Sequence, residues 1–277
     1  MPIVRANGVD IYYEEVGSGV PLVWSHEFGG DYRSWEPQMR YFGRRYRVIA
    51  YNHRGYPPSE VPKDPAAYSS AQLVGDLHQL LRALGIREAH VGGLSMGANV
   101  ALNFGIAYPA MVRSLVIAAC GSGSVNREQA LAQYAAHADA VERDGIHALL
   151  ENFDALASRQ AFRAKDPRGW EEFRRHAAEH SPQACAHLLR GVIMRRRTIF
   201  ELETELAALT VPTLIMVGDQ DEPCIEPALF MRRHIRRAGL AMLPMSGHTI
   251  NIEEPGLFNT HVAEFLAAVE SGRWGPA

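Results

Sequence analysis

Short apolar runs alternate along this chain with amphipathic stretches, and the alternation predicts strands and helices in turn. The chain opens with a hairpin pattern, in which residues 3–6 and 9–14 flank Asn7-Gly8, a pair that tolerates the positive φ angles of a tight turn. Further along, strands are expected at 22–25, 47–53, 88–94, 114–120, 211–217 and 240–245, with helices near 35–44, 71–84, 96–108 and 258–269. This order predicts an α/β fold whose mostly parallel sheet is covered by helices on both faces.

The alternation stops between residues 122 and 209, where no segment has the pattern of a strand. Apolar residues recur there at helical spacing, and Pro167 and Pro182 are placed to interrupt helices. The sequence therefore predicts a core domain made of residues 1–121 and 210–277, with a helical insertion at 122–209.

The stretch with the most chemical information is Gly93-Leu94-Ser95-Met96-Gly97, a Gly-x-Ser-x-Gly pattern between a strand-like and a helix-like run. At such a junction the chain turns sharply on the serine, whose hydroxyl is then held up for attack, and the glycines let the two elements approach. Ser95 is accordingly the candidate nucleophile. The alternative is a structural serine in a glycine turn.

A serine hydroxyl needs a base, and the base needs an acid that fixes its tautomer. His248 is the candidate base, because it follows the strand-like run 240–245 in the loop Ser246-Gly247-His248. The acid is expected in the loop after residue 217, where Asp219 and Asp221 both stand. The run 114–120 is followed by Gly-Ser-Gly and offers no carboxylate.

With these motifs the chain resembles the α/β-hydrolase superfamily, and within it small serine esterases and enol-lactonases with a helical cap. The resemblance rests on the Gly-x-Ser-x-Gly pattern, a Gly-x-x-Asp at 218–221, Gly247-His248, and the loop Asn52-His53-Arg54-Gly55-Tyr56. It implies an eight-stranded type of sheet and a Ser95, Asp221, His248 triad in that chain order. Asp221 then inherits the role of the acid, and Asp219 is expected to brace the loop.

The resemblance also assigns the oxyanion hole, the pair of backbone N–H groups that stabilises negative charge in acyl transfer. One N–H is expected from Met96 and the other from Phe28, in the loop His26-Glu27-Phe28-Gly29-Gly30. His26 is expected to brace this loop. Glu27 replaces the usual glycine, and its charge would oppose the developing oxyanion. We therefore expect its side chain to point away or to pair with Arg54 or Arg33, in preference to a direct catalytic role.

The implied activity is hydrolysis of a small carboxylic ester or lactone through an acyl-enzyme. Serine in place of aspartate disfavours the alkyl-enzyme chemistry of dehalogenases and epoxide hydrolases. Two alternatives use the same fold: carbon–carbon bond hydrolysis or a lyase step on the same triad, and a ligand receptor without turnover. The insertion is expected to cover Ser95 and select the substrate, the alternative being an outgrowth that only adds stability.

Charge and composition limit the kinds of binding partner and cofactor that are expected. The net charge of −3 and pI near 6.5 argue against nucleic acid, and the triplet Arg195-Arg196-Arg197 is expected on a solvated helix face, with contact to a substrate anion as the alternative. Three scattered cysteines predict neither disulfides nor a metal site, and no cofactor is expected. Without a leader-like or membrane-length segment, a soluble cytoplasmic protein is expected, with monomer and homodimer both open.

Overall fold

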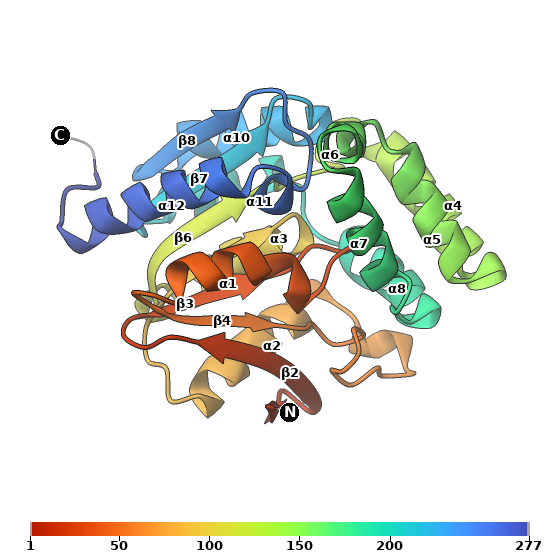
Figure 1. Ribbon diagram of the computed structural model, residues 1–277, viewed down its shortest axis with the longest axis horizontal. Helices are drawn as coiled ribbons and strands as arrows, with labels where there is room; N and C mark the ends of the chain where they lie inside the picture. The colour runs from red at the N-terminus through yellow and green to blue at the C-terminus, as the bar shows by residue number, and fades with distance from the viewer. Residues whose placement is uncertain (1, 276–277) are drawn as a thin grey trace.

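The computed structural model describes residues 2–275, which form one eight-stranded sheet in the order β1-β2-β4-β3-β5-β6-β7-β8 (Figure 1). The predicted α/β class is confirmed. The strands are β1 (Ile3–Ala6), β2 (Val9–Val16), β3 (Pro21–Ser25), β4 (Arg47–Tyr51), β5 (Ala89–Leu94), β6 (Val112–Ala118), β7 (Thr213–Gly218) and β8 (Ala238–Leu243).

The first two strands are antiparallel, and β2 pairs antiparallel with β4, whereas every later pairing is parallel. The predicted hairpin turn is confirmed, since Asn7 and Gly8 both have positive φ, 50° and 81°. Because β3 and β5 to β8 run the same way, the loops that follow them gather along one edge of the sheet. The candidate site residues lie in these loops or, for Met96, at the start of the helix that follows β5.

Helices cover both faces of the sheet. On one face α1 (Glu36–Phe42), α11 (Ile250–Glu253) and α12 (Pro255–Glu270) pack around a core that includes Trp24, Trp35 and Phe258. The other face holds α2 (Ser70–Ala83), α3 (Met96–Ala107) and α10 (Glu222–His234). The remaining short turns of this part are η1 (Tyr32–Trp35), η2 (Pro65–Ala67) and η3 (Pro109–Met111).

Between β6 and β7 the chain forms helices joined by turns and no strand, and we call this segment the insertion. In Figure 1 its green helices stand together at one end of the sheet. Pro167 and Pro182 each open a helix, where a missing N–H costs least. The elements are α4 (Arg127–Asp144), α5 (Ile146–Ala155), η4 (Ala157–Arg159), α6 (Gln160–Lys165), α7 (Pro167–Ala177), α8 (Pro182–Leu188), η5 (Leu189–Ile193), η6 (Phe200–Leu202) and α9 (Glu203–Ala208).

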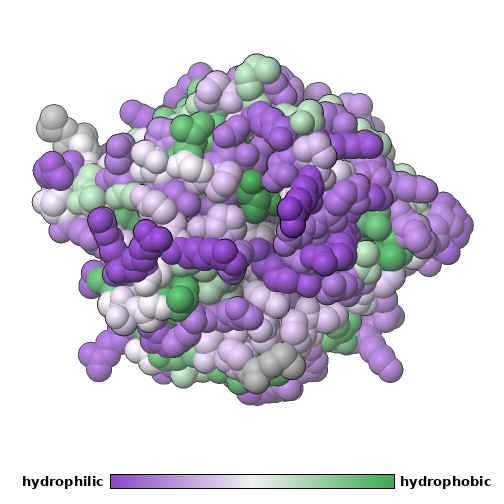
Figure 2. Space-filling model, viewed as in Figure 1, coloured by the Kyte–Doolittle hydropathy of each residue, from purple (hydrophilic) through white to green (hydrophobic). Residues whose placement is uncertain are grey.

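Hydrophilic residues dominate the face drawn in Figure 2, and hydrophobic ones are scattered over it. Within residues 2–275, no helix combines the length and the apolar character that crossing a membrane requires.

Candidate active site

Ser95 sits on a sharp turn between β5 and α3, as the sequence predicts. Its backbone angles, φ 54° and ψ −111°, are strained for a residue with a side chain. A Cβ on Gly93 would collide with the backbone of Gly97, and a Cβ on Gly97 would collide with the Ser25 carbonyl. The Ser95 N–H donates to the Ala118 carbonyl at 2.9 Å. Glycine on both sides of the serine is therefore a steric requirement of this turn.

His248 and Asp221 come together at the same edge of the sheet. Nδ1 of His248 lies 2.7 Å from Oδ2 of Asp221, and both residues are buried. Burial of the ring and the charge of Arg159 favour its neutral form, but the carboxylates of Asp221 and Glu27 together outweigh them, so the pKa of His248 is raised above its ordinary value. The carboxylate holds Nδ1, which leaves Nε2 to exchange a proton.

Asp219, the other candidate acid, has a different role. Its Oδ1 accepts the Ser246 N–H at 3.1 Å, and therefore braces the loop that carries His248. That loop lies directly against the end of β7, because a Cβ on Gly218 would collide with the carbonyls of Ser246 and Gly247. The structure thus brings Asp221, and not Asp219, to the histidine.

Ser95 shares this edge with the His248–Asp221 pair, and its side chain forms no hydrogen bond with His248 in the described chain. Ser95 follows β5, Asp221 follows β7 and His248 follows β8, so the three residues belong to loops of one parallel set. Ser95 and His248 are each 8% exposed. Catalytic hydrogen bonds are often open without substrate and tighten when it binds.

The two expected oxyanion donors follow the neighbouring strands β5 and β3. Met96 is the first residue of α3, where an N–H has no partner within the helix. Phe28 lies after β3, and its N–H donates to no acceptor within residues 2–275. The Tyr56 hydroxyl donates to the Phe28 carbonyl at 2.8 Å, and thereby fixes the peptide that follows the expected donor.

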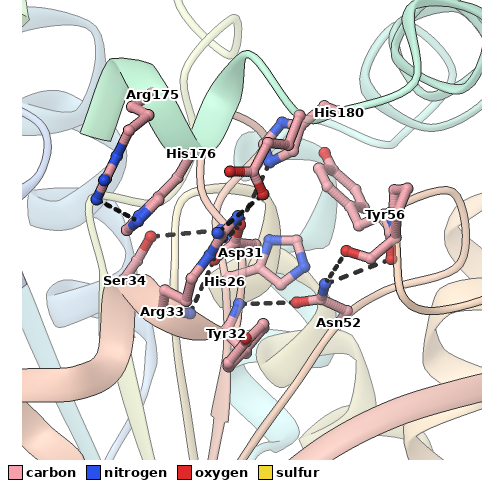
Figure 3. A network of polar contacts seen from close by, with 12 residues as sticks. His26, Asp31, Tyr32, Arg33, Ser34, Asn52, Tyr56, Arg175, His176 and His180 are labelled. Atoms are coloured by element: carbon pink, nitrogen blue, oxygen red, sulfur yellow. Dashed lines mark hydrogen bonds and ion pairs between the residues drawn. The ribbon is translucent and has the colours of Figure 1, made fainter. Parts of the chain in front are cut away.

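A network of polar contacts holds the loop that follows β3, residues 26–30, in place (Figure 3). His26 braces the loop as expected: Nε2 accepts the His53 N–H at 3.1 Å, and Nδ1 bonds the Glu27 carbonyl at 2.7 Å. Burial lowers the pKa of His26 to about 4, so the ring is neutral. Asn52 links the segments that follow β3 and β4. Its Oδ1 accepts the Tyr32 N–H at 2.7 Å, and its Nδ2 donates to the Pro57 carbonyl at 2.8 Å.

Glu27 has an arginine partner, but not one of those expected. Its carboxylate is 2% exposed and bonds both terminal nitrogens of Arg159, from η4 of the insertion, at 2.5 and 3.2 Å. The expected partners are occupied elsewhere: Arg54 pairs with Asp76, and Arg33 with Asp31. Burial alone would raise the pKa of Glu27, yet the charges of Arg159 and His248 hold it below its ordinary value.

The neighbours of Arg159 complete the contact between the insertion and the site. Its guanidinium lies over the rings of Phe153 and Phe173, 4.7 and 5.0 Å from their centres. The same rings cover Gly29, where a Cβ would lie only 2.7 and 3.1 Å from them. The adjacent Ser158 carbonyl accepts the His248 N–H at 2.8 Å. Sequence reasoning missed these residues, because no local motif marks them.

Two further expectations concern charge and metal ligands. The expectation of a solvated helix face for the arginine triplet is wrong, since the triplet lies in the turn between η5 and η6 and Arg196 is only 8% exposed. Ligating atoms of Asp221, Cys224 and His248 lie within 4.8 Å of one another, a spacing that a metal ion could use. However, burial and the nearby Asp221 raise the pKa of the Cys224 thiol well above its usual value, and metals bind the thiolate. These three residues are therefore better described as the His248–Asp221 hydrogen bond next to the buried thiol of Cys224 than as a metal site.

Fold and sequence together define the class. Residues 20–255 match the family model described as the alpha/beta hydrolase fold. The chain belongs to the α/β-hydrolase family, and it is a hydrolase.

Similar proteins include lactonases and esterases. The chain is 27% identical to 3-oxoadipate enol-lactonase 1 of Acinetobacter baylyi over 90% of its length and 89% of that protein. A thermophilic esterase from Thermogutta terrifontis has a similar structure, with a TM-score of 0.86 and 27% identity, over 97% of this chain and 99% of the other. The enol-lactonase of Burkholderia xenovorans shares the fold, with a TM-score of 0.83 and 24% identity over 96% and 100%.

Proposed function

We propose that the protein is a serine hydrolase that cleaves a small carboxylic ester or lactone through an acyl-enzyme on Ser95, His248 and Asp221. The observation that carries the proposal is the 2.7 Å contact of His248 Nδ1 with Asp221, in loops that share one sheet edge with the strained Ser95. Lactonase and esterase names among the similar proteins support the substrate class.

In the first half-reaction, Ser95 Oγ attacks the ester carbonyl carbon while His248 Nε2 takes its proton. Negative charge moves to the carbonyl oxygen, where the N–H groups of Phe28 and Met96 stabilise it. Asp221 stabilises the imidazolium that forms. His248 then gives its proton to the leaving oxygen as the carbon–oxygen bond breaks, which leaves Ser95 acylated.

In the second half-reaction, water attacks the acyl carbon while His248 takes a proton from it. The same oxyanion donors stabilise the intermediate. The bond to Ser95 Oγ breaks, and His248 returns its proton to that oxygen, so the acid product leaves and the enzyme is restored. With a lactone, the alcohol and acid ends stay in one molecule.

The insertion acts in this proposal as a cap that shapes the acyl pocket. The support is its contact with both site loops, by Arg159 to Glu27 and by the Ser158 carbonyl to the His248 N–H. Aromatic rings from the insertion, including Phe153 and Phe173, lie against the oxyanion loop at Gly29. Because charged and aromatic side chains make part of this contact, substitutions of them can change the shape of the pocket without changing the catalytic residues.

A fluorophosphonate labelling experiment tests the proposal. We expect the reagent to modify only Ser95, and Ser95→Ala to lose both labelling and turnover of a nitrophenyl ester. The parent protein should release a burst of nitrophenol as the acyl-enzyme accumulates. Labelling that persists in Ser95→Ala would contradict the serine mechanism. A panel of nitrophenyl esters, a lactone and a ring-cleavage diketone separates ester hydrolysis from carbon–carbon cleavage.

A further inference from the structure

A cavity of about 750 Å³ lies where the insertion meets α2 and α3, and its lining does not include Ser95, Asp221 or His248. The first turn of α2 forms one wall, Asn99 and Asn103 of α3 form another, and the insertion closes the third. Small-molecule sites commonly have volumes of about 300–1,000 Å³. The cavity is therefore large enough for an organic molecule.

The charge of the lining is strongly one-sided. Four arginines line the cavity, Arg190, Arg195, Arg196 and Arg197, and no carboxylate does. Arg190 pairs with Asp139 and Glu142, and Arg197 with Glu205, outside the cavity. For Arg195 and Arg196, residues 2–275 supply no carboxylate within ion-pair distance. Two positive charges at this wall thus have no counter-charge from the chain.

Arg196 is the more informative of the two, because it is buried. One of its terminal nitrogens donates to the carbonyl and hydroxyl of Ser122, at 2.7 and 3.2 Å, and both acceptors are neutral. Burying a charge is costly unless an opposite charge accompanies it. The other two buried arginines of the described chain, Arg54 and Arg159, each pair with a buried carboxylate. An anion is the partner that Arg196 lacks.

Other groups at the wall also lack partners. Ser70 and His187 line the cavity, but Ser70 Oγ and His187 Nε2 are themselves shielded from it and form no hydrogen bond within residues 2–275. Ser70 and Ala71 begin the 14-residue helix α2, and the N–H groups of a first helical turn carry partial positive charge. A ligand with oxygen acceptors would bind these N–H groups.

We propose that this cavity is a binding site for a small organic oxyanion, a phosphate or carboxylate compound, held by Arg195 and Arg196. Guanidinium groups bind both kinds of oxyanion through charge-assisted hydrogen bonds. The N–H groups of Ser70 and Ala71, in the first turn of α2, add polar contacts. Because its walls come from the insertion, α2 and α3, a bound anion ties the insertion to the rest of the molecule.

The proposal goes beyond ester hydrolysis and does not depend on it, since the candidate catalytic residues do not line the cavity. A Ser95→Ala protein should bind the anion as well as the parent does. The experiment can therefore distinguish failure of the catalytic proposal from failure of the anion-site proposal.

Titration calorimetry at low ionic strength tests the site, with glycerol 3-phosphate and succinate as organic probes and inorganic phosphate as the bare anion. We expect at least one organic probe to bind with one-to-one stoichiometry and more tightly than inorganic phosphate. Arg195→Met removes an exposed side chain, so the protein should fold normally, and it should weaken binding at least about tenfold. Arg196→Met should weaken it further. The matched control is Arg87→Met, an exposed arginine just before β5 that does not line the cavity.

Comparison of the two organic probes tells whether a phosphate or a carboxylate is preferred, and either preference supports the site. Three outcomes would overturn the proposal. One is the absence of binding by every probe at millimolar concentration. Another is affinity unchanged in Arg195→Met. The third is an equal loss in Arg87→Met, which would indicate attraction to overall charge and not a site.

Discussion

The loops of the sheet edge and the insertion both reach the candidate active site, but they are held there by different kinds of contact. Backbone packing holds the sheet loops: side chains at Gly93, Gly97 or Gly218 would collide with neighbouring backbone. The insertion adds side-chain contacts, the Arg159–Glu27 ion pair and the aromatic rings over Gly29. It also makes backbone contact, because the Ser158 carbonyl accepts the His248 N–H and lies where a Cβ on Gly247 would be.

The two kinds of contact suit two different tasks, the placing of the reacting groups and the selection of a substrate. Reacting groups must be placed to within a fraction of an ångström, and backbone contacts between neighbouring strands supply that accuracy. A pocket for different substrates needs a wall that can vary, and side chains on helices supply it. We therefore expect substitutions in the sheet loops to change the rate for every substrate, and substitutions in the insertion to change stability or preference.

The largest loss of activity is expected from a substitution in the loop that follows β7. Asp221→Asn should lower kcat by about three to four orders of magnitude, because the amide favours the wrong tautomer of His248. Asp219→Asn is the matched control: it should cost roughly tenfold or less, since Asp219 only braces the Ser246 N–H. Steady-state kinetics with one nitrophenyl ester measures both. If the two variants exchange their effects, the acid is Asp219.

The sequence predicted the sheet-loop half of this comparison well, because its constraints are local. A glycine two residues either side of Ser95 and Asp221 three residues after Gly218 are visible as short motifs. The insertion half was less predictable. Arg159 lies 132 residues from Glu27, and only the fold brings them together. The burial of Arg196 between two exposed arginines likewise depends on how its segment packs, which an arginine triplet does not reveal.

The next largest effect is expected on stability, when the buried ion pair between Arg159 and Glu27 is broken. Arg159→Met leaves the Glu27 carboxylate buried without its counter-charge, which should destabilise the protein by about 3–5 kcal/mol at neutral pH. Without Arg159, burial raises the pKa of Glu27, so the loss should grow as pH rises and shrink where the carboxyl becomes protonated. Urea unfolding at acidic and neutral pH measures this.

Two controls make that result specific. Adding Glu27→Gln to Arg159→Met should restore much of the lost stability, because no buried charge then remains. Arg163→Met, at an exposed position on α6, should have little effect. A double variant no more stable than Arg159→Met alone would mean that packing against the aromatic rings, and not charge, is the main contribution of Arg159.

A smaller effect is expected on substrate preference. Phe173→Leu removes part of the ring that covers Gly29, which should change the ratio of kcat/KM between short and long acyl esters by roughly tenfold. Phe200→Leu is the matched control, since that insertion ring packs on Phe230 of α10 with 5.0 Å between centres. Equal losses on every ester in Phe173→Leu would show that the insertion only stabilises the fold.

The smallest change is expected from Glu27→Gln, which tests whether this unusual residue tunes the site or reacts in it. The amide can still accept a hydrogen bond from Arg159, so kcat/KM should stay within about tenfold of the parent near neutral pH. Glu27 is one of the charges that raise the pKa of His248, and its removal should lower that pKa. Since His248 must be neutral to act as a base, the acidic limb of the pH–rate profile should move to lower pH. Glu179→Gln, at an exposed carboxylate paired with Arg33, should leave the limb in place. A loss beyond about a hundredfold, together with disappearance of one limb, would instead make Glu27 an acid or base in the reaction.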